Sequence, residues 1–210
     1  MLRRNIYIII DRELILKSTK DLFEVTREIL KGKPDFIQLR AKETPSKELL
    51  EIALKISKMV KRYKVKFLIN DRVDIAKLAK AEGVHLGKDD LSPRYARKIL
   101  GKGAFIGKTV HSLQEAYLSL KEPINYVSIG PIFKTSLKPQ LKPLGIEKAL
   151  KISSVFTNKK IMTFFIGGIN LKRTSQLLKK GINNLVLCRE VLLNKNPRNT
   201  IEALKELILN

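Results

Sequence analysis

Short runs of apolar and β-branched residues alternate along the chain with longer segments in which apolar residues recur at a helical spacing. This alternation predicts parallel strands joined by crossover helices, and it recurs about eight times. The predicted strands are Asn5 to Ile10, Asp35 to Arg40, Val65 to Asn70, Gly83 to Leu86, Phe105 to Thr109, Tyr126 to Gly130, Met162 to Ile166 and Asn184 to Cys188.

Helices are predicted between these strands and after the last one. They cover Asp21 to Lys31, Lys47 to Tyr63, Val73 to Lys80, Pro93 to Leu100, Leu113 to Lys121, Ile146 to Phe156, Leu171 to Lys180 and Asn199 to Leu209. Residues that suit an N-cap precede four of them, namely Thr19, Ser46, Ser92 and Ser112.

Eight parallel strands form either a closed barrel or an open doubly wound sheet. An open sheet of that class carries a Gly-rich phosphate turn after its first strand, and the segment IIIDREL has none. We therefore predict one (β/α)₈ TIM barrel over residues 1–210. The longest irregular stretch, residues 132–144, follows the sixth strand, and such loops are usually functional or mobile.

Composition narrows the class of protein. Hydrophobic residues make up 44% of the 210 residues, which is enough for a packed core. No apolar run reaches the length of a membrane span, and the N-terminal apolar run stops at Asp11, so we expect a cytoplasmic protein without a membrane partner. A lone cysteine, Cys188, excludes an internal disulfide, and two distant histidines lack zinc-ligand spacing.

The net charge of +22 is compatible with nucleic-acid binding, with anionic substrates or with a Lys-rich surface. Lys and Arg occur along nearly every predicted helix, interleaved with Glu as in KELLEIALKISKMVKRY, rather than in one block. This distribution disfavours a dedicated nucleic-acid surface.

Polar residues close several of the predicted strands, where the active site of such a barrel lies. After the second strand, Gln38 and Arg40 point to the same side and Lys42 follows on the loop. Two cations beside an amide suit a diphosphate, although either cation alone is equally compatible with an ordinary surface position.

Acidic residues follow the third and fourth strands, in INDR and HLGKDD. Asp71 and Asp90, with Asp89 beside the latter, are placed to hold one Mg²⁺, which prefers one or two carboxylates together with substrate phosphates. Alternatively, Asp71 pairs with Arg72 or caps a helix, and Asp89 or Asp90 caps another. Asp74 is interpreted as a capping or surface residue.

The remaining strand ends offer phosphate-binding groups. The fifth strand contains Gly107, which permits close backbone approach, and Thr109, whose hydroxyl is suited to donate to a phosphate oxygen. His111 is equally compatible with a structural role. The paired glycines 167 and 168, after the seventh strand, are placed to expose backbone N–H groups to an anion.

Six strings, taken in order, resemble those of the thiamine phosphate synthase family: QLRAK, INDR, GVHLGKDDL, IGKTVHS, YVSIGPIFKT and IGGI. The resemblance implies an enzyme that joins hydroxymethylpyrimidine diphosphate to thiazole phosphate with Mg²⁺ assistance and releases pyrophosphate. By matching position, it implies that Gln38, Arg40, Lys42 and Asn70 hold the pyrimidine diphosphate, Asp71 and Asp90 bind Mg²⁺, and Thr109 and Lys138 contact the departing pyrophosphate. Arg40, Thr109 and Lys138 are thereby the expected catalytic residues.

Thr135 and Gly168 match positions that hold the phosphate of the thiazole in this family, and here the chain departs from the pattern. Leu137 stands where a second threonine is usual, Arg189 where a small hydroxyl residue is usual, and Lys88 where glutamine is common. Arg189 offers a stronger, charged phosphate contact from another direction, so we expect thiazole-phosphate binding to be altered or shifted rather than lost. We therefore include it among the substrate-binding residues.

Two other functions are compatible with this sequence. The sister family of thiazole tautomerases shares the barrel and a string similar to VHSLQEA, but Pro131 occupies the position of its catalytic histidine. A non-catalytic barrel that binds phosphate or nucleic acid has little need for both Asp71 and Asp90. The synthase is preferred, its partners being the two small-molecule substrates, with a homodimer as a further expectation.

Overall fold

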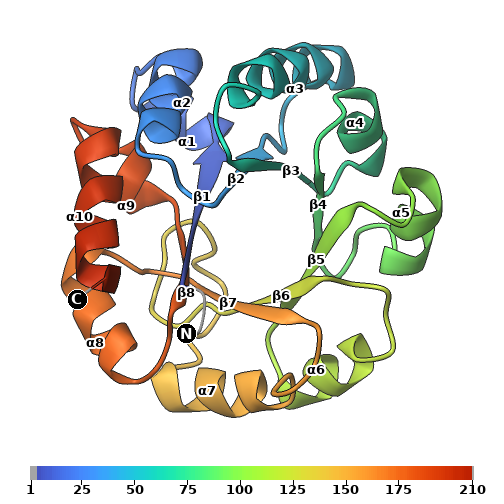
Figure 1. Ribbon diagram of the computed structural model, residues 1–210, viewed down its shortest axis with the longest axis vertical. Helices are drawn as coiled ribbons and strands as arrows, with labels where there is room; N and C mark the ends of the chain where they lie inside the picture. The colour runs from blue at the N-terminus through green and yellow to red at the C-terminus, as the bar shows by residue number, and fades with distance from the viewer. Residues whose placement is uncertain (1–3, 210) are drawn as a thin grey trace.

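A closed ring of eight parallel strands forms the centre of the protein (Figure 1). The computed structural model describes residues 4–209, and in it each strand pairs with its sequence neighbour while β8 closes the ring on β1. The strands are β1 Asn5–Asp11, β2 Phe36–Arg40, β3 Lys66–Asn70, β4 Gly83–Leu86, β5 Phe105–Val110, β6 Tyr126–Ile129, β7 Met162–Ile166 and β8 Asn184–Leu187. The predicted (β/α)₈ barrel is confirmed, and residues 1–3 and 210 of the predicted domain lie outside the described residues.

Helices surround the ring on its outer side (Figure 1). Every predicted helix is present, and two short helices that the periodicity did not indicate, α1 and α9, directly follow β1 and β8. Four to six residues are too few to display a helical period. The helices are α1 Arg12–Lys17, α2 Leu22–Lys31, α3 Ser46–Val60, α4 Val73–Leu78, α5 Pro93–Leu100, α6 Leu113–Ser119, α7 Ile146–Ser154, α8 Leu171–Lys179, α9 Arg189–Leu192 and α10 Pro197–Leu209.

The predicted N-caps are partly wrong. Thr19 has a left-handed backbone with φ 58°, and α2 is capped instead by Asp21, whose carboxylate accepts from two N–H groups of the first turn. Ser46 is already the first helical residue of α3. Ser92 and Ser112 are N-caps, but only the Ser112 side chain accepts a backbone hydrogen bond. Sequence alone does not decide which of several neighbouring polar residues adopts the extended backbone of a cap.

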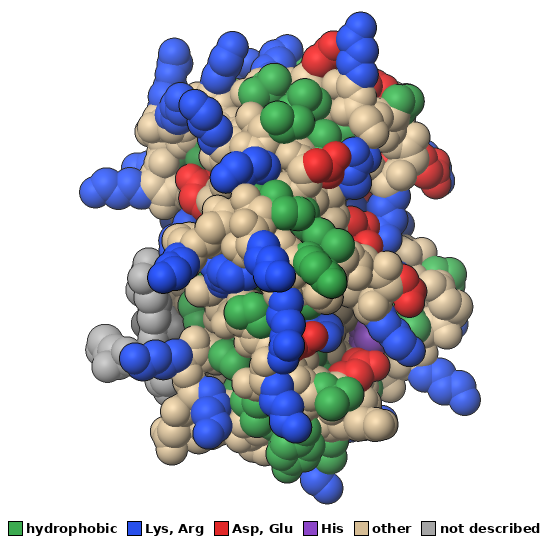
Figure 2. All heavy atoms as spheres, turned by 90° about the vertical axis from the view of Figure 1, so that its right-hand side faces the viewer, with side chains coloured by type: hydrophobic (Ala, Val, Ile, Leu, Met, Phe, Trp, Pro, Cys, Tyr) green, Lys and Arg blue, Asp and Glu red, His purple; other side chains and the backbone are tan. Residues whose placement is uncertain are grey.

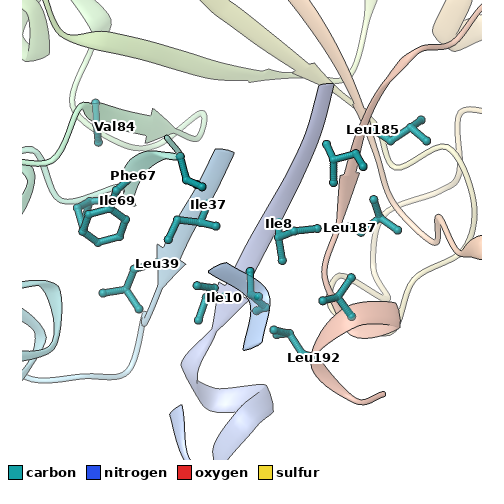
Figure 3. Close-up of a cluster of buried hydrophobic side chains, with 14 of the residues drawn as sticks. Ile8, Ile10, Ile37, Leu39, Phe67, Ile69, Val84, Leu185, Leu187 and Leu192 are labelled. Atoms are coloured by element: carbon teal, nitrogen blue, oxygen red, sulfur yellow. The ribbon is translucent and has the colours of Figure 1, made fainter. Parts of the chain in front are cut away.

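The main hydrophobic core lies between the strands and the helices. Alternate strand residues such as Ile8, Ile10, Ile37 and Leu39 point outward and are almost completely buried against this shell. Figure 3 shows these side chains on their strands, with Leu192 of α9 near Ile10. The aliphatic half of each strand pattern therefore attaches the helices to the barrel.

The other half of each strand pattern faces the barrel interior. A second cluster, formed chiefly by Tyr7, Phe36, Leu68, Tyr126 and Phe164, fills the barrel interior. The ring of Tyr126 packs against Phe164 with centroids 5.4 Å apart. The interior is thus a packed core rather than a pore, as is usual for this fold.

Within residues 4–209, no helix combines the length and the apolar character that crossing a bilayer requires. On the face seen in Figure 2, Lys and Arg side chains are spread over the surface with acidic side chains between them. The cations on this face do not gather into one continuous patch.

Candidate active site

A cavity of about 170 Å³ opens at the carboxyl ends of the strands. It lies above the aromatic core, and the loops after β2, β3, β6, β7 and β8 contribute to its wall. The residues expected in the site that line it are Gln38, Arg40, Lys42, Asn70, Asp71, Thr109, Thr135, Lys138, Gly168 and Arg189. Asp90 is not among the described lining residues and contacts the site through Asp71 and Gly87.

Arg40 ends β2 and forms an ion pair with Asp11 at the end of β1. Asp11 is almost completely buried, and its other carboxylate oxygen accepts from the Leu14 N–H at 2.9 Å as the cap of α1. A buried carboxylate thus fixes the guanidinium at the cavity wall, since leaving either charge unpaired would be costly. In the sequence, Asp11 marks only the end of an apolar run, although an acid at the end of a barrel strand is itself an indication of a functional site.

Asp71 follows β3 and carries a left-handed backbone with φ 63°. Its carboxylate pairs with the Lys42 ammonium at 3.1 Å. Burial and the neighbouring carboxyl of Asp90 together raise the pKa of Asp71 to about 6, against the opposing effect of Lys42. A strained backbone that holds two acids together is typical of a functional site.

The alternative roles considered for these acids, pairing with Arg72 and capping of a helix, differ from what the structure shows. Arg72 pairs with Asp74, with 2.6 Å between Nη2 and Oδ2, and the N-cap of α4 is Arg72 itself. Asp90 does not cap α5: its Oδ2 accepts from the Gly87 N–H at 2.6 Å. Asp74 lies exposed in the first turn of α4, as interpreted from the sequence.

The pair Asp71 and Asp90 fits a magnesium ion better than a softer metal. Residues 4–209 contain no group of three or more His, Cys, Asp and Glu side chains arranged to hold a metal. Burial and the nearby Asp90 carboxyl raise the pKa of Asp71, and two adjacent carboxylates repel each other unless a proton or a cation lies between them. Mg²⁺ commonly takes one or two carboxylates and completes its shell with water and phosphate oxygens.

Lys138 approaches the same charges from the loop after β6. Burial lowers the pKa of its ammonium, Lys42 and Arg40 lower it further, and Asp71 and Asp90 oppose the change. The loop is attached to the end of β7 by backbone hydrogen bonds, Ile132 N–H to Ile166 at 2.8 Å and Phe133 N–H to Gly167 at 3.0 Å. Three cations and two acids therefore surround one side of the cavity.

The paired glycines after β7 allow this loop to pack closely. Gly167 has φ 103°, and a Cβ atom there would lie 2.4 Å from Pro131. At Gly168, φ is 65° and a Cβ atom would lie 2.7 Å from the Lys134 carbonyl oxygen. Glycine is required at both positions for conformational and steric reasons, in addition to any role in binding an anion.

Two residues at and beneath the inner wall of the cavity were not assigned from the sequence. Gln38 donates to Asn70 at 2.7 Å and accepts from the buried hydroxyl of Tyr7 at 2.8 Å. Thr109 hydrogen-bonds to His85 at 2.9 Å. Tyr7 and His85 were visible only as members of strand patterns, because nothing in a single sequence tells which inward side chains meet across a barrel.

Gly107 has a different role from the expected one. A Cβ atom at this position would lie 1.9 Å from the ring of Tyr126, so the glycine leaves room for that ring rather than for a ligand. His111 lines the cavity, and its Nδ1 is hydrogen-bonded to the Gly130 carbonyl. Its backbone N–H donates to Glu115 at 2.7 Å, which fixes the start of α6.

Comparisons with known proteins identify the family of the chain. A family model described as thiamine monophosphate synthase matches residues 6–191. The chain belongs to this family. The thiamine-phosphate synthase of Persephonella marina is 34% identical over 206 residues, covering 98% of this chain and 96% of the relative. Thiamine-phosphate synthase 1 of Aquifex aeolicus is 32% identical over 200 residues, covering 95% and 91%.

A solved structure supports the same family. The thiamine phosphate pyrophosphorylase of Pyrococcus furiosus superposes with a TM-score of 0.85 at 30% identity, covering 98% of this chain and 95% of that one. The structure of KGPDC from Streptococcus mutans, with a TM-score of 0.67 at 13% identity, shares the fold alone. Membership of the thiamine monophosphate synthase family is thus supported by sequence and by structure.

Proposed function

We propose that the protein is a thiamine-phosphate synthase that joins the pyrimidine of hydroxymethylpyrimidine diphosphate to thiazole phosphate and releases pyrophosphate. The observation that carries this proposal is the meeting of Arg40, Lys42 and Lys138 with the acids Asp71 and Asp90 at one cavity. Such a cluster suits a diphosphate accompanied by a divalent cation. The family of the chain names the same product.

The diphosphate is proposed to lie among Arg40, Lys42 and Lys138. Arg40 is held by Asp11, which leaves its planar group fixed against the cavity wall. Burial and the nearby cations Lys42 and Arg40 lower the pKa of the Lys138 ammonium, and an arriving diphosphate relieves the repulsion among these cations. The attraction grows as the bond to the departing pyrophosphate breaks, because negative charge develops on the leaving group.

The acids Asp71 and Asp90 are proposed to hold Mg²⁺ beside the same diphosphate. The ion, when bound, supplies a Lewis acid that stabilises the charge on the leaving group. Asp71 is paired with Lys42, so a carboxylate that would hold the ion and a cation that would contact the diphosphate lie side by side. Gly87 donates to Asp90 and fixes the orientation of that carboxylate.

The pyrimidine is proposed to lie deeper, against Gln38 and Asn70. These two amides are hydrogen-bonded to each other, so their positions are set before the substrate arrives. Carbon–oxygen cleavage ahead of attack leaves a methylene cation that the electron-rich aminopyrimidine stabilises. The ring nitrogen of the thiazole then forms the new carbon–nitrogen bond, and no protein nucleophile is required.

The thiazole phosphate is proposed to bind on the opposite side, near Thr135, Gly168 and Arg189. Leu137 also lines this part of the cavity and donates no side-chain hydrogen bond. Arg189 is the first residue of α9, is exposed and lines the cavity, which supports a charged contact from it to the phosphate. Arg189→Ala is therefore expected to raise KM for thiazole phosphate more than KM for the pyrimidine diphosphate.

The function is tested by incubating the purified protein with both substrates, with and without Mg²⁺, and measuring thiamine phosphate. Product is expected only with all components. Lys138→Ala is expected to lower kcat by about 10²-fold, as for removal of a group that stabilises developing charge. Lys148→Ala on α7 is the matched control. Product formation that is independent of both Mg²⁺ and Lys138 would refute the assignment.

Thiazole tautomerisation is the alternative outcome of this assay. Isomerisation of a thiazole carboxylate phosphate without pyrimidine or metal would favour it. Pro131 lies in the cavity at the position of the catalytic histidine expected for that activity. A phosphate-binding barrel without catalysis would show pyrophosphate binding and neither product, and salt-sensitive DNA binding would support a nucleic-acid function.

We also propose that the protein acts in the cytoplasm, because phosphorylated substrates of this charge do not cross membranes and are used in the compartment where they are made. A homodimer stays a prediction. Light scattering of the purified protein tests it, with a molar mass close to twice 24.0 kDa as the expected result.

A further inference from the structure

A chain of hydrogen bonds crosses the interior of the barrel beneath the cavity. It joins side chains from β1, β2, β3, β4, β5 and β6, so its members lie far apart in the sequence. In order, its members are Asn70, Gln38, Tyr7, Tyr126, His85 and Thr109. The five successive distances between their donor and acceptor atoms are 2.7 Å, 2.8 Å, 3.0 Å, 3.0 Å and 2.9 Å.

The hydrogen bonds of this series all run in one direction, because each hydroxyl group has one hydrogen to donate. Tyr7 donates to the Gln38 amide oxygen, so the Tyr7 oxygen accepts from Tyr126. Tyr126 has then used its hydrogen and accepts from Nδ1–H of His85. The other nitrogen of a neutral imidazole is an acceptor, so Thr109 donates its hydroxyl hydrogen to it.

The middle of the chain is rigid and dry. Tyr7 and Tyr126 are 1% and 0% exposed, which leaves their hydroxyl groups no water to replace a lost partner. Tyr126 stacks between Phe105 and His85, with ring centroids 5.1 Å and 5.6 Å away. Gly107 is needed for this position, because any side chain there would meet the Tyr126 ring.

We propose that Tyr7, Tyr126 and His85 are positioning residues that fix the donor and acceptor pattern of the substrate pocket. They orient the Gln38 amide at one end and make the Thr109 oxygen a hydrogen-bond acceptor at the other. Thr109 then receives a donor of the bound substrate, of the class of the amino group of an aminopyrimidine. This inference rests on the proposed function for the identity of that substrate.

The inference changes the role expected for Thr109. A hydroxyl that has given its hydrogen to His85 offers only lone pairs to the cavity and therefore does not donate to a phosphate oxygen. If Thr109 donated to pyrophosphate instead, every bond from His85 to Gln38 would have to reverse, and the Gln38 amide would have to turn over. The burial of both tyrosines leaves no point at which the chain can reverse in part.

The tautomer of His85 reports the direction of the hydrogen-bond chain. It is measured by ¹⁵N NMR on the purified protein at pH 7.5 without substrates. The protein has two histidines, so a His111→Gln variant assigns the signals to one or the other. We expect Nδ1 of His85 to carry the proton in the wild type. A predominant Nε2–H form, or an imidazolium, would overturn the proposal, and this readout needs no mutation of the barrel interior.

Two conservative variants test whether the tyrosine hydroxyl groups determine the tautomer of His85. Tyr126→Phe removes one contact of His85, whereas Tyr7→Phe removes a hydroxyl that does not touch it. Both are expected to shift His85 toward a mixture of tautomers, and Tyr95→Phe, at an exposed tyrosine of α5, is the control. A His85 spectrum unchanged in Tyr7→Phe would show that no directional coupling exists, and thermal unfolding checks that each variant is folded.

Kinetics and binding test the consequence for Thr109. Thr109→Val and Tyr126→Phe are each expected to lower kcat/KM by about tenfold, and the double variant by about the same factor rather than a hundredfold, because both remove one shared function. Thr109→Ser should restore activity. The Kd of pyrophosphate with Mg²⁺ should change less than twofold in Thr109→Val but about tenfold in Lys42→Ala.

The outcomes separate this inference from the proposed function. Equal weakening of pyrophosphate binding by Thr109→Val and Lys42→Ala would overturn the acceptor role, even if thiamine phosphate is formed. A wild-type protein that makes no thiamine phosphate but shows the Nδ1–H tautomer would refute the synthase and keep the directional chain. Fully multiplicative losses in the double variant would show that Thr109 and Tyr126 act independently, contrary to the proposal.

Discussion

The two faces of each barrel strand have different chemistry. The outward face is aliphatic: Ile8, Ile10, Ile37 and Leu39 are buried between the strands and the helices (Figure 3). The inward face is aromatic at one level and polar above it, where Gln38 is 1% exposed and hydrogen-bonded. Residues adjacent in sequence, such as Ile37 and Gln38, therefore contribute to stability and to chemistry separately.

This difference indicates how a single barrel combines a stable hydrophobic core with buried charges and a strained backbone. Burial of the outward face stabilises the folded protein because it removes apolar area from water, whichever apolar side chains it contacts. The inward face keeps a left-handed Asp71 and a buried Asp11 that only fixed partners make tolerable. Substitutions on the outward face should thus reduce stability, and those on the inward face should reduce activity.

The largest effect is expected for Asp71→Asn. Asparagine tolerates the left-handed backbone and removes the repulsion with Asp90, so the free energy of unfolding should stay equal or rise. Loss of a metal-binding carboxylate should lower kcat/KM by about 10³-fold, which corresponds to about 4 kcal/mol. Steady-state kinetics over a Mg²⁺ series measures this, with Asp74→Asn as the matched control. Unchanged kinetics would remove Asp71 from the site.

The opposite behaviour is expected for Ile10→Ala on the outward face. Ile10 is 0% exposed, and its truncation should lower the free energy of unfolding by about 2–5 kcal/mol through lost burial and a residual cavity. The KM values of the folded protein should stay within about twofold. Urea denaturation provides the measurement, and Leu54→Ala, at a position 40% exposed, should cost far less. Equal losses at both positions would contradict the packing described for this face.

Gly107→Ala, on the inward face, is expected to lower both stability and activity. The added methyl group collides with the Tyr126 ring, since its Cβ would lie 1.9 Å away, and overpacking of this kind costs about 1–3 kcal/mol. Activity should fall in addition, because Tyr126 connects Gln38 to Thr109. Gly103→Ala, where the added Cβ meets nothing within 4 Å, is the control. Wild-type stability together with wild-type activity would show that the ring can move without consequence.

The smallest effect concerns acid stability. Burial, together with the ammonium of Lys138 and against the opposing effect of Asp90, lowers the pKa of His85 to about 3. Between that value and the unfolded pKa of about 6.5, the unfolded chain binds a proton that the folded protein does not. Stability from this group is therefore present above about pH 6.5 and is lost as the pH falls.

The expected loss between pH 7 and pH 5 is on the order of 1–2 kcal/mol. Urea denaturation at a series of pH values measures it. His85→Gln should remove this part of the pH dependence, whereas His111→Gln should keep it. The same slope in wild type and His85→Gln would mean that His85 titrates normally in the folded protein.

Much of the fold was predictable from local pattern. The alternation of apolar runs and helical segments indicated all eight strands and the helices between them, because each outward face has to be aliphatic whatever its exact neighbours. α1 and α9 were missed because four to six residues hold no period, and the N-cap of α2 was misplaced by two residues. These errors are local and leave the barrel unchanged.

The site was predictable where a polar residue ends a strand, since the carboxyl ends of parallel strands meet at one mouth of the barrel. Arg40 and Asp71 were found in this way, and the structure places both at one cavity. Asp11, Tyr7, Tyr126 and His85 were not assigned. Their roles depend on partners that lie across the ring, and a strand pattern does not specify which inward side chains meet.

The sequence by itself determined the barrel, the aliphatic outward faces and the collection of charges at the strand ends, because these follow from periodicity and from the polarity of parallel strands. Only the tertiary structure decided that Asp11 holds Arg40, that Asp71 approaches Asp90, and that Tyr126 crosses above Gly107. Those contacts join residues on different strands. Closure of the ring brings them within hydrogen-bonding distance, and no local preference encodes that closure.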